Sequence, residues 1–182
     1  MYPTLPRIDG VRLSLRLVMP DDAAYIHGLR TDPAYNSHLS AVTGTIKDQR
    51  AWIEAYKARE AAGDEVYYLI TRKDGVPCGT VRLYDITADR FTWGSWILDE
   101  NKPPKAALES AVLSFGVGFE RLGLRLAQLD VRRANARAIA FYRRFGMTGT
   151  GEDDENLYFT LHRDDFRRNR DDFMKILQDQ AA

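Results

Sequence analysis

The sequence predicts a mixed α+β fold, in which helices flank one central sheet. Three strand-like segments follow one another directly between residues 66 and 98, which favours antiparallel pairing. A helical segment separates the last of them from a further strand at 126–131, which indicates a crossover connection. A chain of 182 residues with 45% apolar residues is sufficient for one domain with a sizeable core.

Each element is indicated by its apolar period and by the residues at its ends. In Val11–Val18, leucines alternate with polar residues, as in a strand with one buried face. Asp21 or Asp22 is expected to cap the first helix, and Thr45 and Asp48 match a capping box for the second. The expected elements are strand 11–18, helix 21–30, helix 45–63, strands 66–71, 78–86 and 91–98, helix 105–122, strand 126–131, helix 136–145, and two short strands around Thr148 and Tyr158.

Charge and cysteine content exclude several classes of protein. The 26 basic and 26 acidic residues balance, which argues against a general nucleic-acid binder. The apolar runs are too short for a membrane span, and the N-terminus lacks a secretory pattern. Cys78 is the single cysteine, so an internal disulfide and a cysteine-based zinc cluster are excluded. We expect a cytoplasmic protein with no metal, no nucleic-acid partner and no membrane partner.

The last segment of the chain, 163–182, is charged and has sparse apolar residues. We expect a helix there and separate this C-terminal tail from a single domain at 1–162. Three alternatives stay open for the tail: it docks on the domain, joins a homodimer, or remains mobile. The sequence does not decide between them.

The most informative stretch is Asn135–Gly146, which directly follows an apolar run at 124–131. This pattern is typical of a buried strand, a short turn and an amphipathic helix that ends at a glycine. Asn135 and Tyr142 are seven residues apart, so both lie on one face of a helix with about 3.6 residues per turn. The pattern resembles the second coenzyme-A motif of the GCN5-related N-acetyltransferases, the GNAT family. An ordinary surface helix is the alternative.

The resemblance covers nearly the whole chain and implies the GNAT fold, a mixed sheet of about seven strands with flanking helices. It implies an enzyme that transfers an acetyl group directly from acetyl-CoA to a primary amine in a ternary complex. In that family the asparagine contacts the pantetheine arm and the tyrosine protonates the departing thiolate. These roles fall on Asn135 and Tyr142. A phenol is protonated at neutral pH, which suits a general acid.

The general base is less well defined by the resemblance. Relatives often carry an acidic residue late in the fifth strand, a position that Asp130 holds here. His38, Asp99 and Glu100 are alternatives, as is a chain of water molecules without a dedicated carboxylate. We take Tyr142 and Asp130 as the predicted catalytic pair.

The cofactor site implied by the resemblance departs from the family at one loop. The usual glycine-rich loop is replaced by Asn101–Ala107, in which two prolines donate no hydrogen bond. Lys102 and Lys105 supply positive charge at the start of a helix, where anions are favoured. A rigid loop before a core helix is the alternative. With acetyl-CoA as co-substrate, the expected contacts come from Trp96, Ile97, Leu98, Lys102, Lys105, Ala106, Ala107, Asn135, Ala138, Phe141 and Arg143.

The acceptor pocket is expected between the first two helices and the central strands, with aromatic and polar side chains that suit a sugar or a base. Segments such as Leu29–Pro33 and Gly94–Ile97 look like a branch of the family that acetylates nucleotide-linked amino sugars in surface-polysaccharide pathways. An N-acetyltransferase of protein N-termini or small amines, and a non-catalytic coenzyme-binding module, are the alternatives. The expected substrate-binding residues are Arg30, His38, Tyr84 and Trp93.

Overall fold

The chain forms one mixed sheet of eight strands, in the order β1-β2-β3-β4-β5-β6-β8-β7. This computed structural model describes residue 5 and residues 7–179, so the ends of the predicted domain and tail lie outside the described residues. The predicted fold class is confirmed, with one strand more than expected. The strands are β1 (Ile8–Asp9), β2 (Leu13–Leu17), β3 (Val66–Arg72), β4 (Pro77–Tyr84), β5 (Arg90–Leu98), β6 (Leu126–Arg132), β7 (Thr148–Glu152) and β8 (Asn156–His162).

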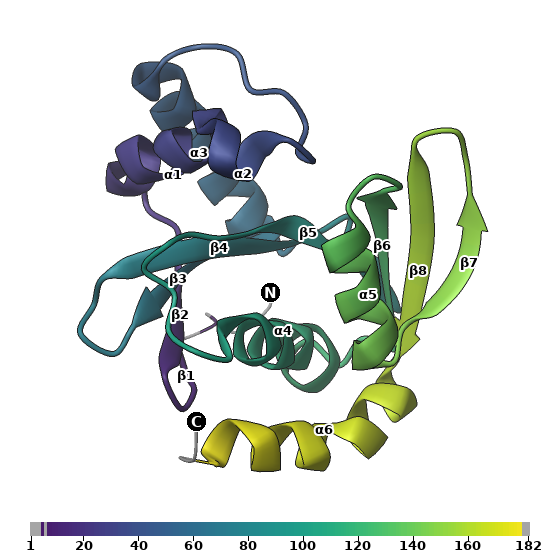
Figure 1. Cartoon of the computed structure of the whole chain (residues 1–182). Coiled ribbons are helices and arrows are strands. Elements are labelled where there is room, and N and C mark those ends of the chain that lie inside the picture. The colour runs from purple at the N-terminus through teal and green to yellow at the C-terminus, as the bar shows by residue number, and fades with distance from the viewer. Residues whose placement is uncertain (1–4, 6, 180–182) are drawn as a thin grey trace.

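Helices cover both faces of the sheet (Figure 1). The first three helices lie on one face, the fourth and sixth lie on the other, and the fifth lies beside β6. A π-helical turn, Val117–Arg121, extends the fourth helix. The helices are α1 (Ala23–Thr31), α2 (Pro33–Asn36), α3 (Ile46–Ala62), α4 (Ala106–Gly116), α5 (Ala136–Phe145) and α6 (Arg163–Gln178).

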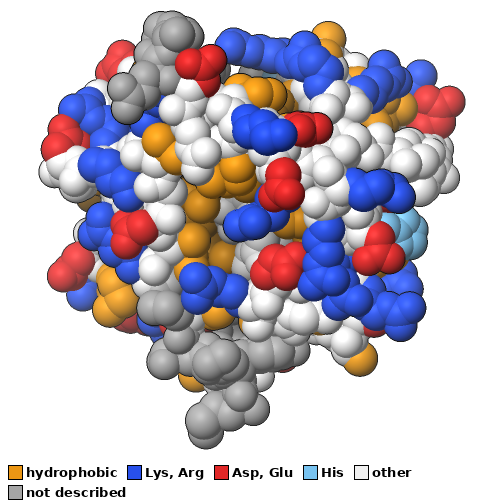
Figure 2. Space-filling model, turned by 90° about the horizontal axis from the view of Figure 1, so that it is seen from below, with side chains coloured by type: hydrophobic (Ala, Val, Ile, Leu, Met, Phe, Trp, Pro, Cys, Tyr) orange, Lys and Arg blue, Asp and Glu red, His pale blue; other side chains and the backbone are white. Residues whose placement is uncertain are grey.

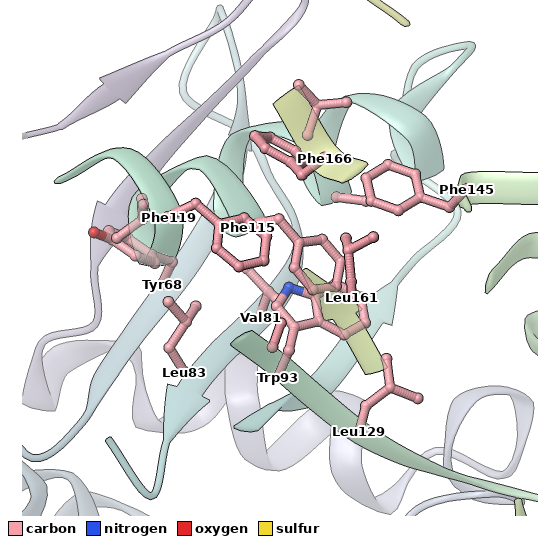
Figure 3. Close-up of a cluster of buried hydrophobic side chains, with 14 of the residues drawn as sticks. Tyr68, Val81, Leu83, Trp93, Phe115, Phe119, Leu129, Phe145, Leu161 and Phe166 are labelled. Carbon is pink, nitrogen blue, oxygen red and sulfur yellow. The ribbon is translucent and has the colours of Figure 1, made fainter. Parts of the chain in front are cut away.

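The main core lies between the sheet and the layer of α4, α5 and α6 (Figure 3). Trp93 of β5 stacks on Phe115 of α4, with ring centroids 4.7 Å apart, and Phe145 of α5 packs against Phe115 at 5.3 Å. A smaller cluster on the opposite face joins Ile53, Tyr56 and other residues of α1 and α3 to β3. Because side chains alternate along a strand, β3 contributes to both clusters.

Two short elements were not predicted. The strand β1 is two residues long and pairs with β2 through Ile8 and Leu15, and so short a segment shows no alternation. The one-turn helix α2 lies between the helices expected at 21–30 and 45–63. Its N-cap is Asp32, whose carboxylate accepts a hydrogen bond from the backbone of Ala34 at 2.9 Å.

Both predicted helix starts have the expected N-cap residue, but only one has the expected side-chain bonds. Thr45 and Asp48 form the expected capping box at the start of α3, where each side chain accepts a hydrogen bond from the other residue's backbone. For the first helix, Asp22 occupies the predicted N-cap position, but its side chain does not cap the helix. Asp22 makes no capping bond to α1, because its carboxylate accepts from Met19 N at 2.8 Å and pairs with Arg16.

The helix α6 is formed by the segment set apart as a tail, and it packs against α4. Phe166 and Leu177 of α6 are each only 1% exposed. Arg12 donates to the carbonyl oxygen of Leu177 at 2.8 Å, and Lys105 donates to that of Ile176 at the same distance. Figure 2 shows the α6 side of the molecule, where basic and acidic side chains are mixed. Buried rings and hydrogen-bonded carbonyls therefore hold α6 to the domain.

The parallel strands β5 and β6 separate along their length. Pairs join 90–92 of β5 to 126–128 of β6. Beyond Thr92 and Gln128, no further pair between these two strands is found in the described part of the chain. The carboxyl halves of the strands therefore diverge, and an opening forms between them.

Candidate active site

A cleft of about 480 Å³ lies where β5 and β6 diverge. The cleft is lined by residues 93–98 of β5, 130–132 of β6, one face of α5, and residues 34, 35 and 37–39. Of the seventeen residues expected at a site, the following twelve line this cleft: His38, Trp93, Trp96, Ile97, Leu98, Lys102, Ala107, Asp130, Asn135, Ala138, Phe141 and Tyr142.

The α5 wall of the cleft is built by the motif that the sequence singles out. Asn135 is the N-cap of α5, and its side-chain oxygen accepts from Ala138 N at 3.2 Å. The Asn135 NH₂ group has no hydrogen-bond acceptor within the described chain and stays free to donate. Gly146 ends the helix with φ of 97°, a left-handed conformation that glycine adopts without steric cost.

Tyr142 lies at the base of the cleft, on the same helix face as Asn135. Its ring packs against Trp93 at 6.0 Å and Trp96 at 6.2 Å, and the residue is 6% exposed. Burial raises the pKa of the Tyr142 phenol well above its usual value, and the charge of Asp130 raises it further. The phenol is therefore neutral at physiological pH and keeps a proton to donate.

The β5 wall contains a β-bulge. Thr80 pairs with Ile97 and Arg82 pairs with Gly94, so two residues of β5, Ser95 and Trp96, oppose one residue of β4. Ser95 has a positive φ of 48°, and its carbonyl oxygen accepts from Thr80 Oγ1 at 3.0 Å. Trp96 is thereby turned toward the main core, and its indole nitrogen donates to Ser110 Oγ at 3.0 Å.

The two tryptophans predicted at the site, Trp93 and Trp96, both contact the main core. Trp93 is 1% exposed, and its indole nitrogen donates to the Ser114 hydroxyl at 2.8 Å. It borders the cleft, but the structure places it in the core as a support for Tyr142 and Trp96. Because its one polar group is already bonded, Trp93 could contact a substrate only through its ring, and substrate binding by Trp93 stays a prediction.

Two lysines near the start of α4 were predicted to contact the cofactor, and their surroundings differ. Lys102 and Ala107 line the cleft. Lys105 does not, because its amine donates to the carbonyl oxygens of Ile176 and Asp179 at 2.8 and 2.9 Å. Ala106 is 2% exposed and belongs to the core. The cofactor contacts expected from Lys105 and Ala106 are not supported by where these residues lie.

Two arginines of α5 line the cleft, but the one predicted to contact the cofactor does not. Arg143 is exposed and is not part of the lining, whereas Arg137 and Arg144 are. Arg137, Phe141 and Arg144 are spaced four and three residues apart, so they share one face of the helix. This spacing is visible in the sequence and could have identified both arginines.

The predicted base, Asp130, and one of its alternatives, His38, line the cleft. Asp130 is exposed and comes from β6, whereas His38 comes from the segment after α2. Asp99 is 5% exposed and accepts from the Tyr25 hydroxyl at 2.6 Å, so its carboxylate is already engaged. Glu100 is exposed, and its backbone N–H donates to the Tyr35 hydroxyl. Asp130 and His38 are thus the two candidates that face the cleft.

Arg30 and Tyr84 lie outside the cleft. The ring of Tyr84 lies under the guanidinium of Arg82 at 4.4 Å, and its hydroxyl lies close enough to Gly94 that a Cβ there would meet it at 3.1 Å. Arg30 lines a second pocket of about 310 Å³, which we call the arginine pocket. Its lining consists of Arg30, Ala41, Val42, Thr43, Gln49, Trp52, Tyr67 and Arg82.

The described residues contain neither a membrane-spanning helix nor a cluster of metal ligands. None of the helices that the structure describes is long and apolar enough to cross a membrane. Among the same residues, no three histidine, cysteine, aspartate or glutamate side chains are grouped as metal ligands would be. The sole cysteine, Cys78, is buried, and this burial raises the pKa of its thiol to about 12.

Similar proteins place the chain in a family. Residues 12–148 match the family described as "Acetyltransferase (GNAT) domain". A solved structure of apo FdhC, described as a nucleotide-linked sugar GNAT, is 38% identical, with a TM-score of 0.87 over 94% of this chain and 98% of that one. No curated protein matches the chain in sequence.

More distant structures share the fold. Spermidine N-acetyltransferase from Vibrio cholerae, solved with CoA and spermine, is 17% identical, with a TM-score of 0.76 over 87% of this chain and 99% of that one. Ribosomal-protein-S5-alanine acetyltransferase from Vibrio fischeri is 14% identical, with the same TM-score over 88% of this chain and 98% of that one. The family match over most of the chain and the identity to FdhC lead to one conclusion: this chain belongs to the GNAT family and is an N-acetyltransferase.

Proposed function

We propose that this enzyme transfers an acetyl group from acetyl-CoA to the amino group of a nucleotide-linked sugar. The observation that carries the proposal is Tyr142, a neutral phenol at the base of a cleft between two diverging strands. The 38% identity to FdhC, described as a nucleotide-linked sugar GNAT, favours this class of acceptor. We further propose a cytoplasmic enzyme of surface-polysaccharide synthesis.

The lining of the cleft fits acetyl-CoA as co-substrate. The free NH₂ group of Asn135 would donate to the pantetheine arm, and the apolar surface of Ala138 and Phe141 would contact it. Lys102, Arg137 and Arg144 would balance the phosphate charges. Arg137 and Arg144 form no ion pair with any described residue, so their charges are free for a ligand.

Acetyl-CoA supplies an activated acetyl thioester. In direct transfer, the new bond joins the acceptor nitrogen to the acetyl carbon, and the bond from that carbon to sulfur breaks. Tyr142 would donate its phenolic proton to the leaving thiolate, and its buried position keeps this proton available. The backbone N–H groups of the bulged β5 segment would stabilise negative charge on the acetyl oxygen.

The acceptor amine must lose a proton before or during its attack. We propose Asp130 as the group that takes this proton, because its carboxylate lies on the cleft wall and influences Tyr142 electrostatically. After one turnover Asp130 would hold the proton from the amine and Tyr142 would have lost its own. Proton transfer between them through water would restore both groups.

The test is a thiol-release assay with acetyl-CoA over a panel of nucleotide-linked amino sugars, polyamines and peptides with free N-termini. The proposal expects turnover with an amino sugar and much slower turnover with the other acceptors. Faster turnover with a polyamine or a peptide would replace the acceptor class and keep the reaction. If calorimetry detects no acetyl-CoA binding, the loop at 101–107 does not hold the cofactor, and a non-catalytic module becomes the better account.

A further inference from the structure

The arginine pocket takes no part in the chemistry proposed above. It lies on the α1–α3 side of the sheet, and its residues come from α1, α3, β3, β4 and the segment 41–43. The cleft has to hold only the reacting amine of the acceptor. A second pocket is therefore expected to bind another part of a large acceptor.

The pocket carries an excess of positive charge. Arg30 forms no ion pair within the described residues. Arg82 Nε donates to Glu65 at 3.1 Å, and the same carboxylate accepts from Arg59 at 2.9 Å. One acidic group is therefore shared by two guanidinium groups, and Arg30 adds a third positive charge. An anionic ligand would complete this arrangement.

The pocket also contains a buried hydroxyl with no partner. Tyr67 is 2% exposed, and its hydroxyl makes no hydrogen bond to any described residue. The ring is held by edge contacts with Tyr56 and Trp52, each at a centroid distance of 5.9 Å. A buried polar group without a partner is unfavourable, so a ligand oxygen here would satisfy a fixed donor.

The sheet register connects the pocket to the cleft. Tyr67 pairs with Arg82, and Arg82 pairs with Gly94, so the three residues lie in one row on one face of the sheet. Gly94 lines the cleft, whereas Tyr67 and Arg82 line the arginine pocket. The row spans two strand spacings, about 10 Å, which a sugar ring and its attached phosphate group can bridge.

We propose that the arginine pocket binds the pyrophosphate of the nucleotide-linked acceptor and so positions the sugar amine in the cleft. This inference rests on the proposed function. Two guanidinium groups and a hydroxyl suit phosphate oxygens, which accept several hydrogen bonds at once. A stacked base is not favoured, because the Trp52 ring already contacts Tyr56, Arg59 and Arg82.

Calorimetric titration tests the pocket with UDP, uridine and inorganic pyrophosphate. Saturating CoA is present throughout, so that phosphate sites in the cleft are already filled. We expect wild-type enzyme to bind UDP and pyrophosphate and not uridine. Arg30→Gln should weaken UDP binding by about tenfold or more, because a charge-assisted contact is lost. Tyr67→Phe should weaken it less and leave thermal stability undiminished.

The matched control is Arg50→Gln, which removes the same charge from an exposed position on α3 outside both pockets. This variant should bind UDP as the wild type does. Equal UDP affinity of Arg30→Gln and wild type would overturn the inference. Uridine binding as tightly as UDP would overturn it too, since the base would then be the bound group.

Kinetics separate this inference from the proposed function. With an amino sugar substrate, Arg30→Gln should raise the KM for the sugar and leave the KM for acetyl-CoA unchanged. If the sugar is acetylated and its KM does not change in Arg30→Gln, the pocket assignment fails and the proposed function stands. If a phosphate-free amine is the substrate and its rate is unaffected by Arg30→Gln, both fail.

Discussion

At the scale of single residues, Tyr142 combines two properties that a general acid needs. Its ring is fixed by packing against Trp93, Trp96 and Phe159, so the hydroxyl position is defined. Burial and the nearby Asp130 raise the pKa of the phenol, so it holds its proton across the working pH range. The same features leave almost no phenolate at neutral pH, so the residue is not available as a base.

Tyr142→Phe should lower kcat by roughly 10²-fold, because it removes the proton donor and keeps the ring packing. Acetyl-CoA affinity by calorimetry should stay close to that of the wild type. A thiol-release assay at saturating substrates measures the effect. An unchanged kcat would remove Tyr142 from the mechanism.

Asp130→Asn should lower kcat/KM by about 10²-fold or more if Asp130 accepts the amine proton. The variant should also lower the pKa of Tyr142, since one cause of its elevation is removed. The pH–rate profile and a spectroscopic titration of the tyrosines give the two readouts. A normal kcat/KM would transfer the role to a chain of water molecules.

At the scale of elements, the loop before α4 has two lysines with different partners. Lys105 adopts a positive φ of 65° at the N-cap of α4, and its amine bonds the C-terminal carbonyls of α6. Lys102 lines the cleft instead. One lysine thus joins two helices, and the other is positioned for a phosphate.

The two lysines should respond differently to the same substitution. Lys102→Gln should raise the KM for acetyl-CoA several-fold with no change in thermal stability. Lys105→Gln should leave that KM unchanged and lower Tm by a few degrees, since α6 loses a contact. Steady-state kinetics and thermal unfolding of both variants measure these two effects. If Lys102→Gln lowered Tm and Lys105→Gln raised the KM for acetyl-CoA, the roles of the two lysines would be reversed.

The helix α6 contributes a buried ring to the core. Phe166→Ala should lower the free energy of unfolding by about 3–5 kcal/mol, because it leaves a cavity beside Phe119 and Phe145. Ile176→Ala is the control, since Ile176 is 49% exposed and should cost less than about 1 kcal/mol. Urea unfolding measures both. If both substitutions lowered the free energy of unfolding by the same small amount, α6 would not be needed for stability.

At the scale of the whole molecule, buried tyrosines control stability at high pH. Burial raises the phenol pKa of Tyr56, Tyr68 and Tyr142 above the value in the unfolded chain. A raised pKa means that the folded state holds these protons more tightly. Their contribution to stability is therefore fully present below about pH 10 and is lost as pH rises further.

The free energy of unfolding should fall above about pH 10 by roughly 1.4 kcal/mol per pH unit for each buried tyrosine. Tyr68→Phe should reduce this slope, and it should cause little loss of stability at pH 7, because the Tyr68 hydroxyl is buried without a partner in the described chain. Urea unfolding between pH 7 and 11 gives the slopes. Identical slopes would show that Tyr68 does not contribute.

Much of this architecture is determined by local sequence. The alternation in Val11–Val18, the capping box at Thr45 and the strand–turn–helix around Asn135 each define an element by short-range preferences. The seven-residue spacing of Asn135 and Tyr142 likewise places both on one side of α5, as the structure has them. Element types and the GNAT motif therefore follow from the sequence alone.

The tertiary structure decided the rest. The β-bulge at Ser95 depends on how many β5 residues oppose β4, and this pairing turns Trp96 into the core. The partner of Lys105 lies 71 residues away on α6, and Arg30 and Arg82 meet only when α1 packs over the sheet. Local preferences carry no information on such distant pairs, because chain closure and packing bring them together.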